Sequence, residues 1–177
     1  KADILLKENG MKGFLVGLSP GASYGPAKRW GIEGFKEAAE AVIKKRGNGG
    51  AVIFGGREDA EAAKELAKRF DVKTLNLAGK TGLRDFLALA ARMSLFIAND
   101  SGAMHAAAAL GVPTIAVFGS TDPGLTGPLG RCLRVVREKL ECSPCFKREC
   151  PYGHYKCLRG IDPVRVADEA EDMLREP

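Results

Sequence analysis

Six short apolar runs, separated by amphipathic segments, constrain this 177-residue chain more than any other feature. The runs rich in Val, Ile and Phe span residues 14–20, 50–56, 73–79, 95–100, 114–120 and, more weakly, 133–136. They are continuous, which is typical of strands buried on both faces. Residues 32–47, 58–70, 83–93 and 163–174 repeat apolar residues three and four apart, which predicts helices. This alternation indicates an α/β fold, a Rossmann-like doubly wound parallel sheet.

Two loops of unusual composition fall where such a fold binds ligands. The expected strand order, 3-2-1-4-5-6, puts the ligand crevice at the carboxyl ends of the first and fourth strands. The loops that follow these strands are SPGASYGPAKRW (19–30) and NDSGAMH (99–105), about 75 residues apart in the chain. Their expected convergence in space predicts a binding site.

The first loop offers flexibility, hydroxyls and one cation. Gly21 and Gly25 relieve steric limits on the backbone, Ser23 brings a hydroxyl, and Lys28 brings a positive charge. The loop is neither a Walker A loop nor a G-x-G-x-x-G fingerprint, which disfavours ATP hydrolysis and NAD binding. By itself it also fits an ordinary turn with a surface lysine.

The second loop predicts an anion site at a helix start. Ser101 and Gly102 begin an alanine-rich helix, whose free N–H groups and dipole favour a phosphate. His105 lies one turn later and could donate to a phosphate oxygen, or it could be a core histidine bonded to a carbonyl. Asp100 could cap the helix or accept hydrogen bonds from sugar hydroxyls.

Two further turns lie at the same expected edge. Glu58 follows the second strand and could reach a ribose, as acidic residues do in dinucleotide sites, or serve as the acidic first turn of a helix. The turn at 78–83, which contains Lys80 and Thr81, could line the base.

Composition is that of a soluble globular protein, with 45% hydrophobic and 28% charged residues. No apolar run is long enough for a transmembrane helix and no signal peptide is present, so we expect a cytoplasmic protein. The net charge of +5 is concentrated late in the chain. It fits a solvated face or an anionic partner such as phosphorylated lipid, and no basic stripe interleaved with aromatics supports nucleic acid.

Residues 142–157, here called the cysteine segment, hold Cys142, Cys145, Cys150 and Cys157 together with His154. The C-x2-C pair is compatible with zinc or an iron–sulfur cluster, but the later spacings of four and six residues do not match a zinc ribbon. Free thiols or local disulfides are favoured, and no metal site is assigned.

Three segments together carry a family resemblance: LSPGASYGPAKRW, ANDSGAMHAAAALGVPTIAVFGSTDP and CSPCFKRECPYGHYKCL. They resemble the C-terminal half of the ADP-heptose:lipopolysaccharide heptosyltransferases of glycosyltransferase family 9, and the cysteine segment resembles the heptosyltransferase II branch. The resemblance covers residues 13–172. It implies that residues 13–177 form the nucleotide-sugar-binding half of a GT-B enzyme. Residues 1–12 would end an interdomain segment, and the N-terminal acceptor domain with its catalytic carboxylate would be absent from this chain.

The resemblance implies an inverting transfer of heptose from ADP-L-glycero-D-manno-heptose to the inner core of lipopolysaccharide (heptosyl-Kdo-lipid A). Lys28 and His105 would be catalytic, because they stabilise the charge that develops on departing ADP. The implied contacts are Ser23 and Lys28 with the diphosphate, Glu58 with the ribose, Lys80 and Thr81 with adenine, Asp100 with heptose, and Ser101, Gly102 and His105 with phosphate. No D-x-D pair for a metal is present.

By this interpretation the chain binds ADP-heptose without turnover, needs no cofactor, and contacts the inner membrane only peripherally. Two alternatives stay open. One is a GT-B transferase or epimerase that uses a UDP-sugar. The other is a non-catalytic, cysteine-rich metal-binding module.

Overall fold

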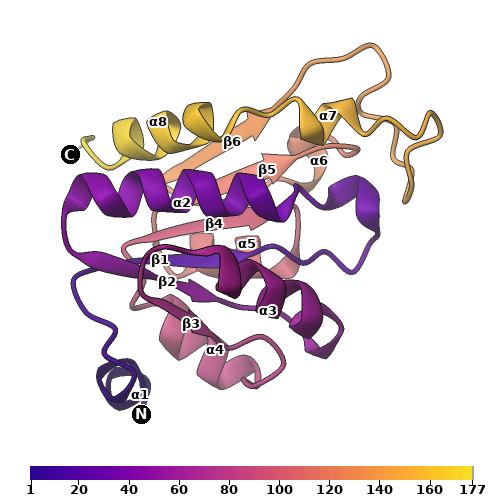
Figure 1. Cartoon of the computed structure of the whole chain (residues 1–177). Coiled ribbons are helices and arrows are strands. Elements are labelled where there is room, and N and C mark those ends of the chain that lie inside the picture. Colours follow the sequence, from indigo (N-terminus) through magenta and orange to yellow (C-terminus); the bar gives the residue numbers. More distant parts are fainter. Residues whose placement is uncertain (177) are drawn as a thin grey trace.

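The computed structural model describes residues 1–176, which fold around a six-stranded sheet (Figure 1). The strands are β1 (Phe14–Ser19), β2 (Gly49–Ile53), β3 (Thr74–Asn76), β4 (Leu95–Asn99), β5 (Thr114–Phe118) and β6 (Leu133–Arg137). They lie in the order β3-β2-β1-β4-β5-β6, and every neighbouring pair is parallel. The predicted fold class and strand order are therefore confirmed.

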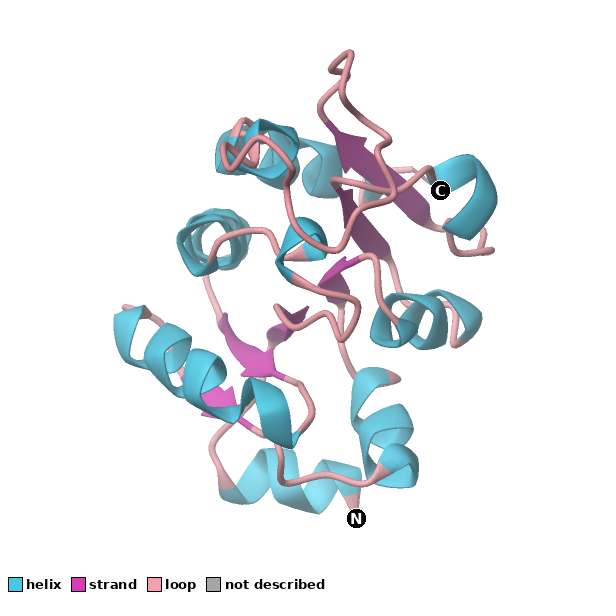
Figure 2. Cartoon of the chain, turned by 90° about the vertical axis from the view of Figure 1, so that its right-hand side faces the viewer, coloured by secondary structure: helices cyan, strands magenta, loops and turns pink. Residues whose placement is uncertain are grey.

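Helices cover both faces of the sheet. The helices are α1 (Ala2–Glu8), α2 (Ile32–Arg46), α3 (Ala60–Arg69), α4 (Leu83–Ala90), α5 (Gly102–Ala109), α6 (Pro123–Thr126), α7 (Lys156–Arg159) and α8 (Pro163–Met173), with 3-10 turns at Pro26–Lys28 (η1) and Arg57–Asp59 (η2). One face carries α2, α3 and α8, and the other carries α4 and α5 with α1 beside α4 (Figures 1 and 2). Within the described residues, no helix has both the length and the apolarity to cross a membrane.

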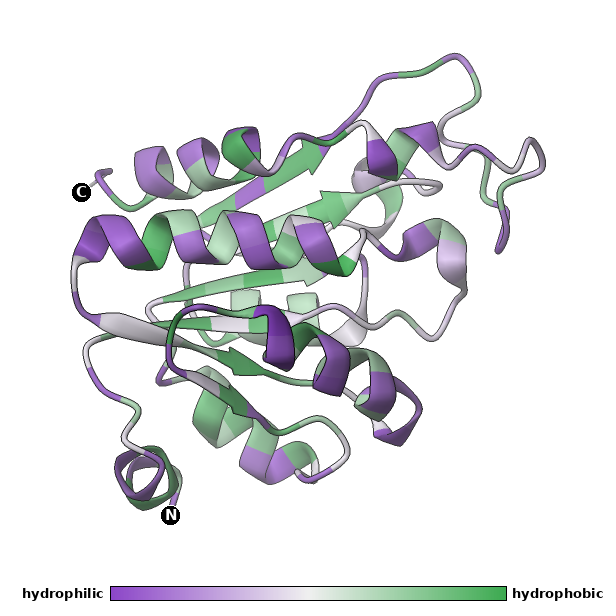
Figure 3. Ribbon diagram, viewed as in Figure 1, coloured by the Kyte–Doolittle hydropathy of each residue, from purple (hydrophilic) through white to green (hydrophobic). Residues whose placement is uncertain are grey.

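The strands feed two cores because successive side chains point to opposite faces. Val16 and Leu18 of β1 pack under α2 and α8, while Leu15 packs on the opposite side with Phe96 and Met104. All five residues of β4 are buried, as are all five of β5. Figure 3 shows the result as apolar strands between helices whose outer faces are polar. This explains the continuous apolar runs of the sequence.

The third strand is shorter than predicted. Only Thr74–Asn76 pair with β2, although the apolar run continues to residue 79. The side-chain Oδ1 of Asn76 accepts a hydrogen bond of 3.0 Å from the backbone N–H of Ala78, and this local bond interrupts the regular ladder. The N–H of Leu77 still donates a 2.8 Å bond to the carbonyl of Ile53 in β2. Leu77 and Ala78 are still buried, so their apolar character reflects core packing beyond the end of the regular strand.

Two other local features connect the sequence with the packing. Asp162 caps α8, because its Oδ1 accepts a 2.9 Å hydrogen bond from the N–H of Val164. Residues 1–12, expected to end an interdomain segment, contain α1, which buries Leu6 and pairs Asp3 with Arg92. That α1 belongs to an interdomain segment stays a prediction.

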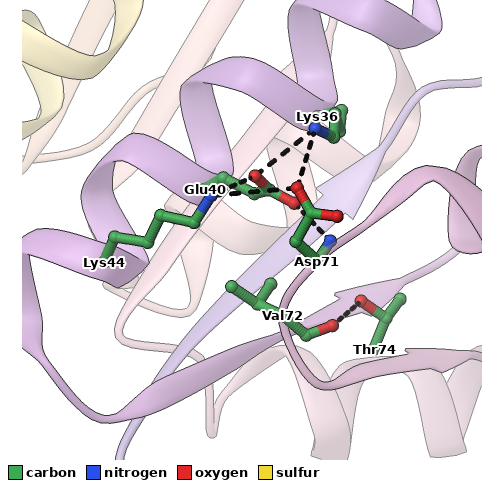
Figure 4. Close-up of polar contacts among 6 residues, drawn as sticks. All are labelled: Lys36, Glu40, Lys44, Asp71, Val72 and Thr74. Carbon is green, nitrogen blue, oxygen red and sulfur yellow. Dashed lines mark hydrogen bonds and ion pairs between the residues drawn. The ribbon is translucent and has the colours of Figure 1, made fainter.

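A buried carboxylate joins α2 to the turn before β3 (Figure 4). Glu40 is 4% exposed, and its Oε1 accepts a 2.6 Å hydrogen bond from the N–H of Asp71. Its Oε2 lies 2.7 Å from Nζ of Lys44 and 3.5 Å from Nζ of Lys36. Burial raises the pKa of Glu40, but these hydrogen bonds and the two cations outweigh it, so the pKa lies below its ordinary value.

Candidate functional site

A cavity of about 400 Å³ opens at the carboxyl ends of the strands, the edge that faces the viewer in Figure 2. Its walls come from the loop after β1, the glycines after β2, the β3–α4 turn and the first turns of α5. The two loops that the sequence singled out therefore meet here, at the point where the strand order reverses. The predicted meeting of the two loops is confirmed, and that this cavity binds a ligand stays a prediction.

The buried amide of Asn99 holds the first loop against the end of β4. Its Oδ1 accepts a 3.0 Å hydrogen bond from the N–H of Trp30, and its Nδ2 donates a 2.6 Å bond to the carbonyl of Pro20. The side chain is fully buried, so neither backbone group has water as an alternative partner. Asn99 thus fixes both ends of the first loop relative to β4.

Lys28 and Asp100 form a buried ion pair between the two loops. Nζ of Lys28 lies 2.5 Å from Oδ2 of Asp100, and the side chains are 11% and 5% exposed. The same Oδ2 accepts hydrogen bonds from Oγ1 of Thr121 at 2.6 Å and of Thr126 at 3.3 Å. Asp100 does not cap α5, so that alternative is wrong: the N-cap residue is Ser101, whose side chain makes no capping bond.

The start of α5 forms one wall of the cavity. Ser101 and Gly102 line it, and Ala103 and Ala106 extend the wall along the helix. The hydroxyl of Ser101 is buried and has no hydrogen-bond partner among residues 1–176. A buried hydroxyl without a partner is costly, which favours a ligand that bonds to it. His105 is exposed on α5 and lies outside the lining of the cavity.

The acidic residues after β2 divide into two environments. Glu58 is exposed at the cavity rim, whereas Asp59 is buried and its Oδ2 accepts a 3.0 Å hydrogen bond from the N–H of Gly56. Gly21 lies directly on the Asp59 carboxylate, where a Cβ would overlap its oxygens. Only glycine therefore permits this approach of the first loop to η2.

The remaining predicted residues take different positions. Ser23 is exposed and lines the cavity, as does Thr81 in the β3–α4 turn. Lys80 does not line it, because its Nζ turns back to donate a 2.9 Å hydrogen bond to the carbonyl of Asn76. Phe54 and Phe86 supply an apolar floor that the sequence analysis did not identify.

The cysteine segment is seated on the first loop through Tyr24. The Tyr24 hydroxyl donates a 2.7 Å hydrogen bond to the carbonyl of Phe146, and its ring lies 4.7 Å from Nζ of Lys28 and 5.2 Å from Cζ of Arg148. Gly25, with φ of +147°, passes so close to Arg148 that a Cβ would lie 2.6 Å from its carbonyl oxygen. The cysteine segment therefore supports the loop that carries Lys28.

All five cysteines are free thiols, so the disulfide alternative is wrong. Among residues 1–176, no group of three or more His, Cys, Asp or Glu side chains is arranged to hold a metal ion. Burial raises the pKa of Cys150, but the backbone N–H groups of Tyr155, Tyr152, His154 and Gly153 outweigh it and lower the pKa. Burial raises the pKa of Cys157, and negative charge on Cys145, Cys150 and Cys142 in their thiolate form adds to that rise.

Sequence reasoning missed the residues that support the site. Asn99 holds the first loop, and Thr121 and Thr126 contact Asp100, but all three residue types are common in loops. One signal was present for Asn99, an amide at the end of a strand that is otherwise apolar. No comparable pattern marks the two threonines, because their partner Asp100 is more than 20 residues away in the chain.

Comparison with known proteins agrees with this geometry. The sequence profile described as glycosyltransferase family 9 (heptosyltransferase) matches residues 3–156. The lipooligosaccharide heptosyltransferase 2 of Campylobacter jejuni is 35% identical over 97% of this chain and 54% of its own length. The lipopolysaccharide heptosyltransferase 2 of Escherichia coli is also 35% identical, over 90% of this chain and 47% of its own length. The chain thus spans about half the length of these relatives.

Solved structures show the same similarity in three dimensions. The E. coli ADP-heptose lps heptosyltransferase II superposes with a TM-score of 0.82 at 31% identity, over 98% of this chain and 50% of that structure. A family 9 glycosyltransferase from Veillonella parvula gives a TM-score of 0.85 at 31% identity, over 99% of this chain and 51% of that structure. On the profile match over residues 3–156 and on these relatives, the chain belongs to glycosyltransferase family 9, the heptosyltransferase family.

Proposed function

We propose that residues 13–176 are the donor-binding half of a heptosyltransferase that takes heptose from ADP-heptose and transfers it to the lipopolysaccharide core. The observation that carries the proposal is the cavity between the first loop and the start of α5, where the buried Ser101 hydroxyl lacks a protein partner. A helix start with free N–H groups beside a lysine-bearing loop suits a diphosphate. The names of the relatives support heptose and lipopolysaccharide.

The proposed contacts follow the positions of the residues. The diphosphate would lie at Ser101 and Gly102, within reach of Ser23 and, after a change of side-chain rotamer, of Lys28. Glu58 at the rim would accept hydrogen bonds from the ribose, and Thr81 would line the adenine above Phe54 and Phe86. His105 would contact the diphosphate only if the diphosphate extends beyond the cavity. Lys80 would contact the adenine only if its side chain rotates away from the carbonyl of Asn76.

These groups would act when the glycosidic bond breaks. Departure of ADP leaves negative charge on the diphosphate, and donors already aimed at that charge lower the barrier by about 3 kcal/mol each. Lys28 and His105 would donate hydrogen bonds to the charge that develops on the diphosphate, and Asp100 would bind the heptose hydroxyls. We assign the acceptor site, the general base and the rest of a GT-B architecture to the portion of the relatives' length that this chain does not cover.

The proposal includes a peripheral contact with the cytoplasmic face of a membrane. The cysteine segment supports it, because Phe146 and Tyr152 are exposed there beside the exposed basic residues Lys147 and Arg148. Aromatic rings and cations on one protruding segment suit an anionic headgroup layer.

Calorimetry with the 177-residue chain tests the proposed function. ADP should bind, UDP and GDP should bind at least about tenfold more weakly, and Lys28→Ala should lower ADP affinity by about tenfold. His105→Ala should lower it too, and Arg84→Ala, an exposed cation outside the cavity, is the matched control. Preferential binding of UDP would favour a UDP-sugar enzyme. Stoichiometric zinc without nucleotide binding would favour a metal-binding module.

A second measurement addresses turnover. Mass spectrometry should detect no heptose transfer by this chain when it is given ADP-heptose and a heptosyl-Kdo-lipid A acceptor. Detected transfer would show that the general base lies within residues 1–177.

A further inference from the structure

We propose that the Lys28–Asp100 pair lets the site distinguish a nucleotide that still carries its sugar from the bare nucleoside diphosphate. This inference rests on the proposed function, because it concerns the ligand of the same site. The Asp100 carboxylate and the diphosphate would compete for the buried ammonium of Lys28.

Lys28 is held tightly by Asp100. Nζ of Lys28 lies 2.5 Å from Oδ2 of Asp100, and the two side chains are only 11% and 5% exposed, so water screens the interaction poorly. The Tyr24 ring, 4.7 Å from Nζ, limits the directions in which the ammonium can move. A diphosphate at the start of α5 would have to draw Lys28 away from this carboxylate.

Asp100 would remain in place when Lys28 moves. Oγ1 of Thr121, in the loop after β5, lies 2.6 Å from Oδ2, and Oγ1 of Thr126, at the end of α6, lies 3.3 Å from it. The first loop carries neither threonine, so both contacts stay when Lys28 moves. The carboxylate also directly precedes Ser101, the N-cap residue of α5. A diphosphate bound at that helix start therefore meets an uncompensated negative charge, which weakens its binding.

A sugar on the diphosphate reverses this effect. All three contacts of the Asp100 carboxylate with residues 1–176 use Oδ2, so Oδ1 can accept from a ligand. A sugar hydroxyl is a donor, and a hydrogen bond to a carboxylate is about twice as strong as a neutral one. The intact donor thus stabilises Asp100 after Lys28 leaves, whereas the bare nucleotide does not. The pair favours entry of the donor and release of the product.

Asp100→Asn tests the inference, since the amide keeps the size and hydrogen-bonding capacity of the side chain but removes its charge. By calorimetry the variant should bind ADP about tenfold more tightly than wild type, because Lys28 is released and repulsion is lost. ADP-heptose should gain less affinity than ADP or should bind more weakly. The Kd of ADP-heptose divided by the Kd of ADP should therefore rise by about tenfold. Asp122→Asn is the matched control: its side chain caps α6 through Gly124, and the ratio should not change.

Three outcomes separate the possibilities. If Asp100→Asn weakens the binding of ADP and of ADP-heptose equally, or leaves the ratio of their Kd values unchanged, the inference is overturned. Failure of wild type to bind either ligand would overturn the proposed function instead. If Asp100→Asn does not fold, the double variant Lys28→Met with Asp100→Asn removes both charges together, and it should bind ADP about tenfold more tightly than Lys28→Met alone. Equal ADP affinities of the double variant and of Lys28→Met would also contradict the inference.

Discussion

Asn99 donates a 2.6 Å hydrogen bond to the carbonyl of Pro20, across 79 positions of sequence. With the bond that its Oδ1 accepts from Trp30, this amide uses both of its functions at once. An amide is required because one partner is an acceptor and the other is a donor. The first loop therefore depends on a side chain of another strand for its position.

Asn99→Asp should destabilise the chain by about 2–4 kcal/mol at pH 7, because a buried carboxylate would face the Pro20 carbonyl without a donor between them. The loss should shrink as pH falls, since the protonated carboxyl can donate to that carbonyl. Urea unfolding at pH 7 and pH 5 measures both effects. Asn76→Asp is the control, because only its Oδ1 is used, by Ala78, and its cost should be small. Equal costs at the two positions would contradict the role given to Asn99.

Glu40→Gln should lower the free energy of unfolding by about 1–2 kcal/mol at pH 7. The folded pKa of Glu40 lies below its ordinary value of 4.5, so its contribution is complete above that value and is lost as pH falls through the folded pKa. The difference between wild type and variant should therefore shrink below pH 4.5. Glu65→Gln, an exposed carboxylate near Arg69, should change stability by less than about 0.5 kcal/mol. A difference that does not vary with pH would refute the assignment to ionised Glu40.

Cys150 and Cys157 should differ in the pH dependence of alkylation by iodoacetamide. The thiolate is the reacting species, so the rate profile of Cys150 should rise at a lower pH than that of Cys157. Peptide mass spectrometry resolves the two sites. Normalising each profile to its own plateau removes differences in access, and in denaturant the profiles should coincide. Coincidence in the folded state would show that the backbone N–H groups do not stabilise the Cys150 thiolate.

Gly21→Ala should cost about 1–3 kcal/mol, because the new methyl group would overlap the Asp59 carboxylate that Gly56 holds in place. ADP affinity should fall as well, since the loop must move away from η2. Thermal unfolding provides the first measurement and calorimetry the second. For stability, Gly102→Ala is the control, because a Cβ there meets no other atom within 4 Å. A melting temperature of Gly21→Ala equal to that of wild type would mean that the loop yields easily.

Some parts of this protein could be read from the sequence because local patterns determine them. The apolar runs predicted the strands, and the reversal of strand order predicted that the loops after β1 and β4 meet. Ser23 and Ser101 of these loops line the cavity, whereas Lys28 does not. The length of β3 was overestimated because the bond from the N–H of Ala78 to the Asn76 side chain interrupts the regular ladder, although Leu77 is buried and still donates to the carbonyl of Ile53. The orientation of Lys80 was not predicted, because its Nζ bonds to the nearby carbonyl of Asn76, a contact that the residue types do not signal. The contact between Lys28 and Asp100 was not predicted either. Phosphate was expected to bind Lys28 and sugar to bind Asp100, and these separate roles gave no sign of an ion pair.

The pairing of β1 with β4, in which Val16 lies opposite Leu95, has a consequence for how the site forms. These strands become neighbours only after two intervening strand–helix units have been placed, so the site has high contact order. Nucleotide binding should therefore be thermodynamically linked to cooperative folding of the whole sheet, and a saturating ligand would slow hydrogen exchange in the sheet core as well as in the loops.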